Sequence, residues 1–149
     1  MGVASEAYPQ LLLENQLCFP LYSAANAVVR AYRPLLTELD LTYSQYIVMM
    51  VLWQQDSVTV GELGESLHLD SGTLTPLLKR LEAKGYVSRR RSGDDERVRV
   101  IAATDTGRAL QERAQAIPLE MACSVGLSMD GGKELKSLCQ QILAALDKN

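Results

Sequence analysis

The sequence predicts a mainly α-helical chain that carries one small β-hairpin, and three observations support this fold class. Apolar residues recur at helical spacing through most of the 149 residues. Two short helical segments in the middle of the chain are separated only by His68, Leu69 and Asp70. Directly after them, two strand-like runs flank the turn-forming sequence from Ser92 to Glu96. This order predicts a winged helix-turn-helix with further helices at both ends of the chain.

The N-terminal part is expected to form two helices. The first covers residues 17–38, and Pro34 is expected to kink or end its regular part. The second, at about residues 44–55, is apolar on nearly all sides, which predicts deep burial. A short extended piece follows at residues 58–60.

The helix-turn-helix is expected to begin with a short helix at residues 61–67. Asp70 or Ser71 caps the second helix, which runs to Lys84. Because proline is tolerated only in a first turn, Pro76 predicts a helix start near Gly72 to Thr75.

The hairpin and the C-terminal helices complete the prediction. Gly85 caps the second helix, and the strands cover residues 86–91 and 97–103. Thr104 or Asp105 then caps a helix that is interrupted by Pro118, and a last helix covers about residues 131–147. We therefore expect three segments: an N-terminal helical segment, the winged helix-turn-helix, and C-terminal helices, at residues 1–40, 41–104 and 105–149.

Composition excludes several classes of protein. No run of 18 apolar residues is present, and the N-terminus lacks the pattern of a secretory signal, so we expect a cytoplasmic protein that does not associate with membranes. Three widely spaced cysteines are not typical of a structural disulfide framework, and their simplest interpretation is reduced thiols. With one histidine and no C-x-x-C motif, we expect no metal site, and no cofactor is indicated.

Charge is distributed unevenly along the chain. The net charge is −3, yet the segment from Lys79 to Arg99 holds eight basic and four acidic residues, a local charge of +4 against −7 elsewhere. Such a segment indicates a phosphate-binding surface, although a solvated charged face would have the same composition.

A winged helix-turn-helix binds DNA through its second helix and its hairpin. The predicted contacts are short hydroxyl side chains at the start of that helix together with charged residues of the helix and hairpin: Ser71, Thr73, Thr75, Lys79, Arg89, Arg91, Asp95, Arg97 and Arg99. Arg97 either touches DNA or braces the hairpin through Asp95, and Ser71 and Thr73 can cap the helix as well as contact bases. Arg89 and Arg90 point to opposite strand faces, so only one of them can face DNA.

The run LDSGTLTPLLKRLEAKGYVSRRRSGDDERVRV, followed by TDTG, resembles the MarR family of transcriptional regulators. The segment LLLENQLCFPLY is similar to the organic hydroperoxide resistance branch of that family, and the resemblance covers residues 10–145. Pro20, after the cysteine, and Ala103, before the threonine that ends the wing, depart from the family pattern. The resemblance implies a homodimer that binds double-stranded operator DNA and responds to organic hydroperoxides. It assigns dimerisation and the sensing cysteine to residues 1–40, DNA binding to residues 41–104, and further dimerisation helices to residues 105–149.

Cys18 is the candidate sensing thiol. Pro20 places Cys18 near a helix start, where backbone N–H groups and the helix dipole favour a thiolate. Tyr22 lies one turn further on the same face, whereas Tyr32 is 14 residues away, about 21 Å along one helix. The family resemblance implies that Tyr32 and Tyr43 donate hydrogen bonds to the cysteine of the partner subunit.

Peroxide attack would convert Cys18 to a sulfenic acid. The resemblance to two-cysteine members implies that Cys123 of the other subunit then forms a disulfide with it, which would change the spacing of the two recognition helices from the required 34 Å or so. Cys139 shares a helical face with apolar residues and is expected in the core. Two alternatives remain open: a repressor of the same fold relieved by a small phenolic or aromatic ligand, and a thiol peroxidase. A buried, unreactive Cys18 is the simplest alternative interpretation of the thiol.

Overall fold

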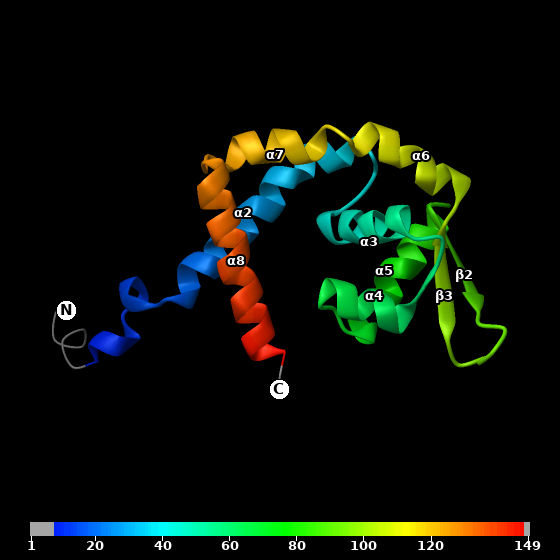
Figure 1. The fold of residues 1–149 in the computed structure, drawn as a ribbon, viewed down its shortest axis with the longest axis horizontal. Helices are drawn as coiled ribbons and strands as arrows, with labels where there is room; N and C mark the ends of the chain where they lie inside the picture. Colours follow the sequence, from blue (N-terminus) through cyan, green and yellow to red (C-terminus); the bar gives the residue numbers. More distant parts are fainter. Residues whose placement is uncertain (1–7, 148–149) are drawn as a thin grey trace. The chain divides into compact units, whose positions relative to one another are not determined.

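The computed structural model describes residues 8–147 and divides into two compact units (Figure 1). The first unit extends to Gln115, and the second begins at Ala116. This division differs from the predicted boundaries after residues 40 and 104, and the three functional segments stay a prediction. The fold class is confirmed, because helices dominate and the strands form one small antiparallel sheet.

The first unit begins with two short 3-10 turns, η1 (Pro9–Leu11) and η2 (Leu13–Asn15), which lead into the long helix α2 (Cys18–Thr37). Pro34 lies inside α2 and does not end it. Pro34 has no backbone N–H, so the Arg30 carbonyl lacks its usual partner in the helix. Both residues are exposed, so water can donate a hydrogen bond to that carbonyl.

Helix α3 (Tyr43–Gln54) begins with a capping box. The Thr42 hydroxyl accepts a hydrogen bond from the Gln45 backbone, and the Gln45 side chain accepts one from the Thr42 backbone. As predicted, α3 is largely buried, with Val48, Met49 and Leu52 inaccessible to solvent.

The helix-turn-helix consists of α4 (Val60–Leu67) and α5 (Ser71–Ala83). His68 ends α4 in the left-handed conformation, at φ 55°. The predicted start of α5 near Gly72 to Thr75 was too late. The Asp70 carboxylate accepts a 2.7 Å hydrogen bond from the Thr73 backbone, which fixes the first turn at Ser71 and leaves Pro76 inside the helix.

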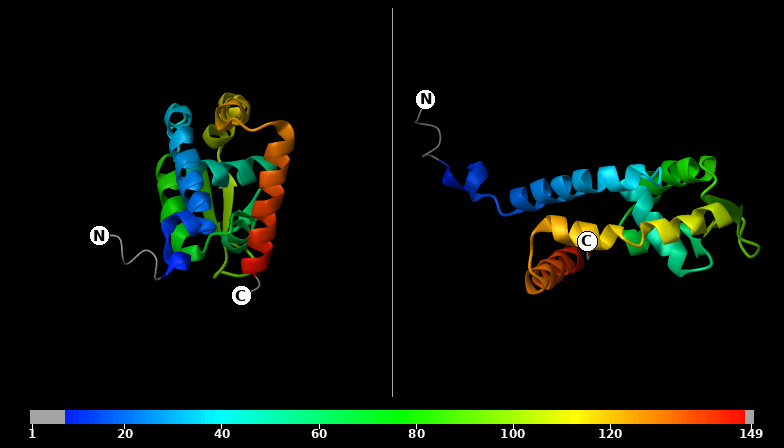
Figure 2. Two further views of the ribbon diagram at one scale, coloured as in Figure 1. Left: turned by 90° about the vertical axis from the view of Figure 1, so that its left-hand side faces the viewer. Right: turned by 90° about the horizontal axis from the view of Figure 1, so that it is seen from above.

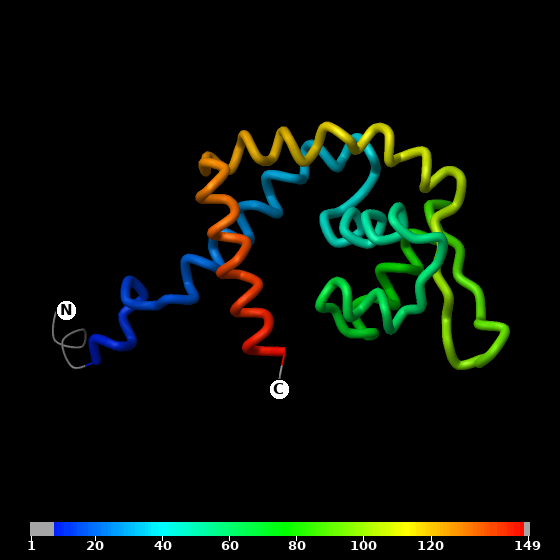
Figure 3. Tube along the Cα trace, in the orientation of Figure 1, coloured from blue at the N-terminus to red at the C-terminus, as the bar shows by residue number. Residues whose placement is uncertain are grey.

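The hairpin strands are β2 (Val87–Arg91) and β3 (Arg99–Ala103), and the short strand β1 (Val58–Thr59) pairs with the other side of β3. The turn between β2 and β3 is easily followed in the Cα trace (Figure 3). Because β1 leads directly into α4, the sheet connects the hairpin to the helix-turn-helix.

Helix α6 (Asp105–Ala114) completes the first unit, and Thr104 caps it. The second unit consists of α7 (Ile117–Val125) and α8 (Met129–Leu146), so Pro118 lies in the first turn of a new helix. Gly126, at φ 75°, ends α7.

The core of the first unit lies between α3, α4, α5 and the sheet, whose ribbons adjoin one another in two perpendicular views (Figure 2). Its fully buried side chains are Leu36, Val48, Met49, Leu52, Leu63, Leu74, Leu78, Leu81 and Ile101. The apolar residues of α8, by contrast, are exposed within this single chain: Leu135, Leu138, Ile142, Leu143 and Leu146.

Candidate DNA interface and redox site

The N-terminal turn of α5 presents the predicted hydroxyl side chains. Ser71, Thr73 and Thr75 are all exposed, and Thr75 donates a 2.8 Å hydrogen bond to the Ser71 carbonyl. Hydrogen bonds from Thr73 to the capping carboxylate lower the pKa of Asp70, so this cap stays ionised. Lys79 is exposed two turns further along the same helix. The turn is therefore rigid and accessible, as base recognition requires.

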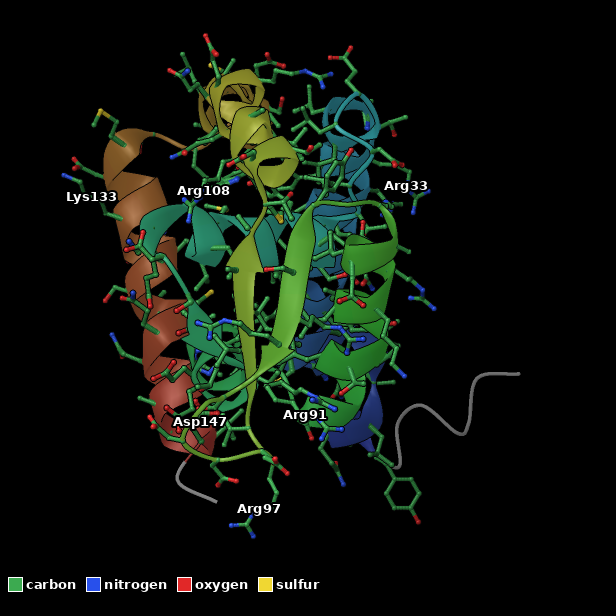
Figure 4. All side chains as sticks on the ribbon, turned by 90° about the vertical axis from the view of Figure 1, so that its right-hand side faces the viewer. Arg33, Arg91, Arg97, Arg108, Lys133 and Asp147 are labelled. Carbon is green, nitrogen blue, oxygen red and sulfur yellow. The ribbon has the colours of Figure 1, made fainter. Side chains whose placement is uncertain are left out.

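The hairpin tip is held by its own hydrogen bonds. Ser92 donates from its backbone to the Val98 carbonyl, and the Asp95 carboxylate accepts from both the backbone and the Nε of Arg97. The Arg97 side chain is nevertheless 92% exposed and projects from the end of the hairpin (Figure 4). Asp95 thus orients Arg97 without covering it, and bracing and phosphate contact are compatible.

Arg91 and Arg99 lie directly opposite each other on β2 and β3, and both are exposed. Like charges in a cross-strand pair destabilise a hairpin. No salt bridge joins either guanidinium to an acidic side chain within the described part of the chain. The pair therefore forms a concentrated positive surface that an anion would stabilise.

Arg89 is placed differently from the other arginines of the wing, which is the hairpin formed by β2, β3 and the turn between them. Its guanidinium forms a 3.0 Å salt bridge with Glu82 of α5, and its Nε is buried without a hydrogen-bond partner in the described residues. Arg90, on the opposite strand face, is exposed. In this structure Arg89 links β2 to α5 instead of pointing outward.

Cys18 is the first residue of α2, and its thiol is exposed. Leu17 provides no side-chain cap, and the first turn holds no acidic residue. The first N–H groups of α2 are therefore available to a negative charge at this position. Tyr22, one turn further, is 67% exposed.

The segment before Cys18 is braced by two side-chain amides. Asn15 donates a 2.7 Å hydrogen bond to the Pro9 carbonyl, and Gln16 donates to the carbonyls of Gln10 and Leu12. Residues that precede and follow Cys18 in the sequence line an open, mainly apolar hollow of about 620 Å³: Leu12, Leu13, Glu14, Phe19 and Pro20. Asn15 and Gln16 thus fix the course of the backbone that leads to Cys18.

Three tyrosines cluster where α2 meets α3. The rings of Tyr32 and Tyr43 are 4.9 Å apart between centroids, and Tyr46 lies 5.8 Å from Tyr32. Burial, followed by the nearby phenols of Tyr43 and Tyr46, raises the pKa of Tyr32. Burial also raises the pKa of Tyr46. Tyr32 and Tyr46 are therefore protonated at neutral pH. Tyr46 is not among the predicted site residues, although its position three residues after Tyr43 indicates the same helix face.

The structure brings Tyr32 and Tyr43 together but does not bring them to Cys18 of the same chain. Since α2 is continuous from Cys18 to Thr37, Tyr32 lies about 21 Å along its axis from the thiol. Cys123 is exposed on α7, and Cys139, expected in the core, is partly exposed on α8. All three cysteines are free thiols.

Residues 8–147 contain neither a group of side chains suited to a metal ion nor a membrane-spanning helix. No group of three or more His, Cys, Asp or Glu side chains is placed to hold a metal ion. In the same residues, no helix combines the length and the apolar character needed to cross a membrane.

Comparison with known proteins identifies the family. The SarA/Rot family of transcriptional regulators matches residues 30–114, more than half of the chain. The organic hydroperoxide resistance transcriptional regulator of Bacillus subtilis is 43% identical over 140 residues, which cover 94% of this chain and 93% of that protein. This chain belongs to the organic hydroperoxide resistance branch of the MarR family. Membership of this family of regulators confirms the prediction that the chain is not an enzyme.

Solved structures agree with this membership of the MarR family. Reduced AbfR bound to DNA is 36% identical, with a TM-score of 0.77 over 94% of this chain and 98% of the other. Disulfide-formed AbfR, a Staphylococcus epidermidis protein, is 35% identical, with a TM-score of 0.62 over 93% of this chain and 98% of the other.

Proposed function

We propose that this regulator represses transcription by binding operator DNA as a homodimer and is released when an organic hydroperoxide oxidises Cys18. The observation that carries the proposal is the position of Cys18, an exposed thiol at the uncapped start of α2. The similarity to the hydroperoxide resistance regulator of Bacillus subtilis supports the same trigger.

The DNA-binding part of the proposal assigns base contacts to the start of α5 and phosphate contacts to the wing. Ser71, Thr73 and Thr75 enter the major groove, while Lys79 and the exposed wing arginines contact the backbone. Arg89, held by Glu82, positions β2 against α5 and contributes to binding indirectly. The similarity to AbfR bound to DNA supports this mode.

The sensing part requires two copies of the chain. Tyr32 lies about 21 Å from Cys18 of its own chain along α2, and the resemblance to the hydroperoxide resistance regulators implies that its phenol and that of Tyr43 reach the thiol of the partner subunit. The pKa of Tyr32 is raised, so its phenol remains a hydrogen-bond donor at neutral pH. The exposed apolar face of α8 is available for dimerisation.

The chemistry proceeds in two balanced steps. The Cys18 thiolate attacks the terminal peroxide oxygen, the O–O bond breaks, and the alkoxide takes a proton from solvent and leaves as an alcohol. Cys18 is thereby oxidised to a sulfenic acid while the peroxide is reduced. The Cys123 thiolate of the partner then attacks the Cys18 sulfur, an S–S bond forms, and hydroxide leaves and is protonated to water.

An organic peroxide suits the surroundings of Cys18 better than hydrogen peroxide does. The hollow lined by Phe19, Pro20 and residues shortly before Cys18 is mainly apolar and can accept an alkyl or aryl substituent. Hydrogen peroxide has no such substituent and gains nothing from this contact. Release should therefore require less cumene hydroperoxide than hydrogen peroxide.

Fluorescence anisotropy with a palindromic operator duplex tests the proposal. Wild type, Cys18→Ser, Cys123→Ser and the control Cys139→Ser are titrated with cumene hydroperoxide, and disulfides are followed by non-reducing electrophoresis. We expect release for wild type and Cys139→Ser, none for Cys18→Ser, and no disulfide-linked dimer for Cys123→Ser. If cumene hydroperoxide released Cys18→Ser from the operator as readily as wild type, the sensing role of Cys18 would be refuted. Release of Cys18→Ser by a phenolic compound would favour the alternative of a ligand-relieved repressor.

A further inference from the structure

A single lysine ties the end of α5 to the loop between α2 and α3. The Lys84 ammonium donates a 2.6 Å hydrogen bond to the Asp40 carbonyl and a 3.1 Å hydrogen bond to Oε1 of Gln45. It also lies 3.4 Å from the Asp40 carboxylate. Three acceptors therefore surround one ammonium, which has three hydrogens to donate.

The acceptors belong to the point where the sensing helix turns into α3. Asp40 has a φ of 54°, and the Leu41 backbone donates to the Leu36 carbonyl, which closes the end of α2. Gln45 is only 4% exposed, and its oxygen accepts hydrogen bonds from both Thr42 and Lys84. The ammonium thus contacts the end of α2 and the start of α3 together.

A second side chain from the same segment strengthens this connection. The Tyr86 hydroxyl donates a 3.1 Å hydrogen bond to the Leu39 carbonyl. Two consecutive carbonyls of the α2–α3 loop, those of Leu39 and Asp40, are therefore bound by residues immediately after α5. We call the contacts among Lys84, Tyr86, Leu39, Asp40 and Gln45 the α5 anchor.

The hydrogen bonds of the α5 anchor matter more than its ion pair. The Asp40 carboxylate is 72% exposed, so solvent screens its attraction to Lys84. The Lys84 side chain is 26% exposed, and its hydrogen bond to the Gln45 oxygen is partly shielded from solvent. Without the ammonium, that oxygen would keep only the Thr42 N–H as a donor, and the Asp40 carbonyl would lose the Lys84 hydrogen bond that ties the α2–α3 loop to the end of α5.

We propose that Lys84 is a positioning residue that transmits movement of the tyrosine cluster to the recognition helix. Tyr43 and Gln45 belong to the first turn of α3, so a displacement of Tyr43 also displaces Gln45. Lys84 is the residue that ends α5, so the displacement reaches the DNA-reading helix directly. This inference rests on the proposed function, in which oxidation of Cys18 changes the hydrogen bonding of the tyrosines.

The measurement is the ratio of operator Kd between the oxidised and reduced proteins, taken at equal extents of Cys18 oxidation verified by mass spectrometry. Lys84→Met keeps the aliphatic stem and removes the ammonium, Lys84→Arg keeps a donor, and Lys133→Met is a control lysine on α8. Tyr86→Phe removes the second link without changing α5. Thermal unfolding shows that each variant is folded.

We expect Lys84→Met to lower the Kd ratio roughly 2- to 30-fold, the range for residues that carry coupling between sites. Tyr86→Phe should lower the ratio less, and Lys84→Arg should recover most of it. An unchanged ratio in folded Lys84→Met and Tyr86→Phe overturns the inference while leaving peroxide sensing intact. A wild type whose Kd does not change on oxidation would instead refute the proposed function itself.

Discussion

A single substitution at the facing arginines of the wing should change DNA binding and the stability of the free protein in opposite directions. Arg91 and Arg99 are opposite each other on β2 and β3, with exposed side chains. In the free protein their charges repel, and in the proposed complex phosphates would neutralise them. Arg91→Gln should therefore weaken DNA binding while it stabilises the free protein.

The magnitude follows from counterion release. Each phosphate contact contributes about 0.9 to the slope of log K against log salt concentration, so a fourfold increase in salt, from about 50 to 200 mM, costs roughly 3.5-fold in affinity per contact. Arg91→Gln should lower the slope by about 0.9, and the double variant with Arg99→Gln by about 1.8. Removing the repulsion should raise the free energy of unfolding by a few tenths of a kcal/mol.

Anisotropy titrations of the reduced protein at several salt concentrations give the slope, and urea unfolding gives the stability. Arg33→Gln is the matched control, because Arg33 is exposed on α2 and away from the hairpin (Figure 4). A slope unchanged in the double variant, or an equal loss in Arg33→Gln, would show that the facing pair does not contact phosphate. A large loss of stability in Arg91→Gln would contradict the repulsion argument.

Three further predictions concern stability. A Cβ at Gly107 would lie 2.1 Å from the Tyr86 carbonyl oxygen, so Gly107→Ala should lower the free energy of unfolding by about 1–3 kcal/mol in urea titrations. The control Gly132→Ala should not lower the free energy of unfolding, because no atom lies within 4 Å of a Cβ at that position. The Thr104 hydroxyl caps α6 and donates to the Gly85 carbonyl, so Thr104→Ala should cost about 0.5–2 kcal/mol and Thr104→Ser much less, as thermal unfolding can show. Because burial raises the pKa of Tyr32 above 10.0, the native state holds that proton more tightly than the unfolded state does. The contribution of this group to the free energy of unfolding is therefore fully present below pH 10 and is lost as the pH rises further. Tyr32→Phe should flatten this alkaline decline, as urea unfolding at several pH values can show. A decline as steep as that of wild type would count against this assignment.

Local signals predicted most of the helices and the hairpin. The helix at residues 17–38 was found at Cys18–Thr37, because its apolar periodicity extends across Pro34. For α5, Pro76 predicts a start that is too late, because the helix begins directly after the Asp70 cap. Capping hydrogen bonds are local, and here they determined the boundary more strongly than the proline did.

Contacts between distant parts of the chain were not predictable in the same way. The sequence indicated an extended piece at residues 58–60 but not that Val58 pairs with Ile101, because strand partners are set by tertiary packing. The salt bridge that holds Arg89 to Glu82, and the hydrogen bonds of Lys84 to the α2–α3 loop, likewise require the fold. Residue type and alternation along the strand show only which side chains are available for such contacts.

The shared strand β3 has a consequence for how this regulator can change state. β3 pairs with β2 on one edge and with β1 on the other, and β1 continues without a break into α4. Bending the wing at its base would break the pairing of Val58 with Ile101 and of Thr59 with Val100. We therefore expect the free and DNA-bound forms of the proposed repressor to keep the base of the wing and α4 together, and to differ mainly in the distance between the recognition helices of the two subunits.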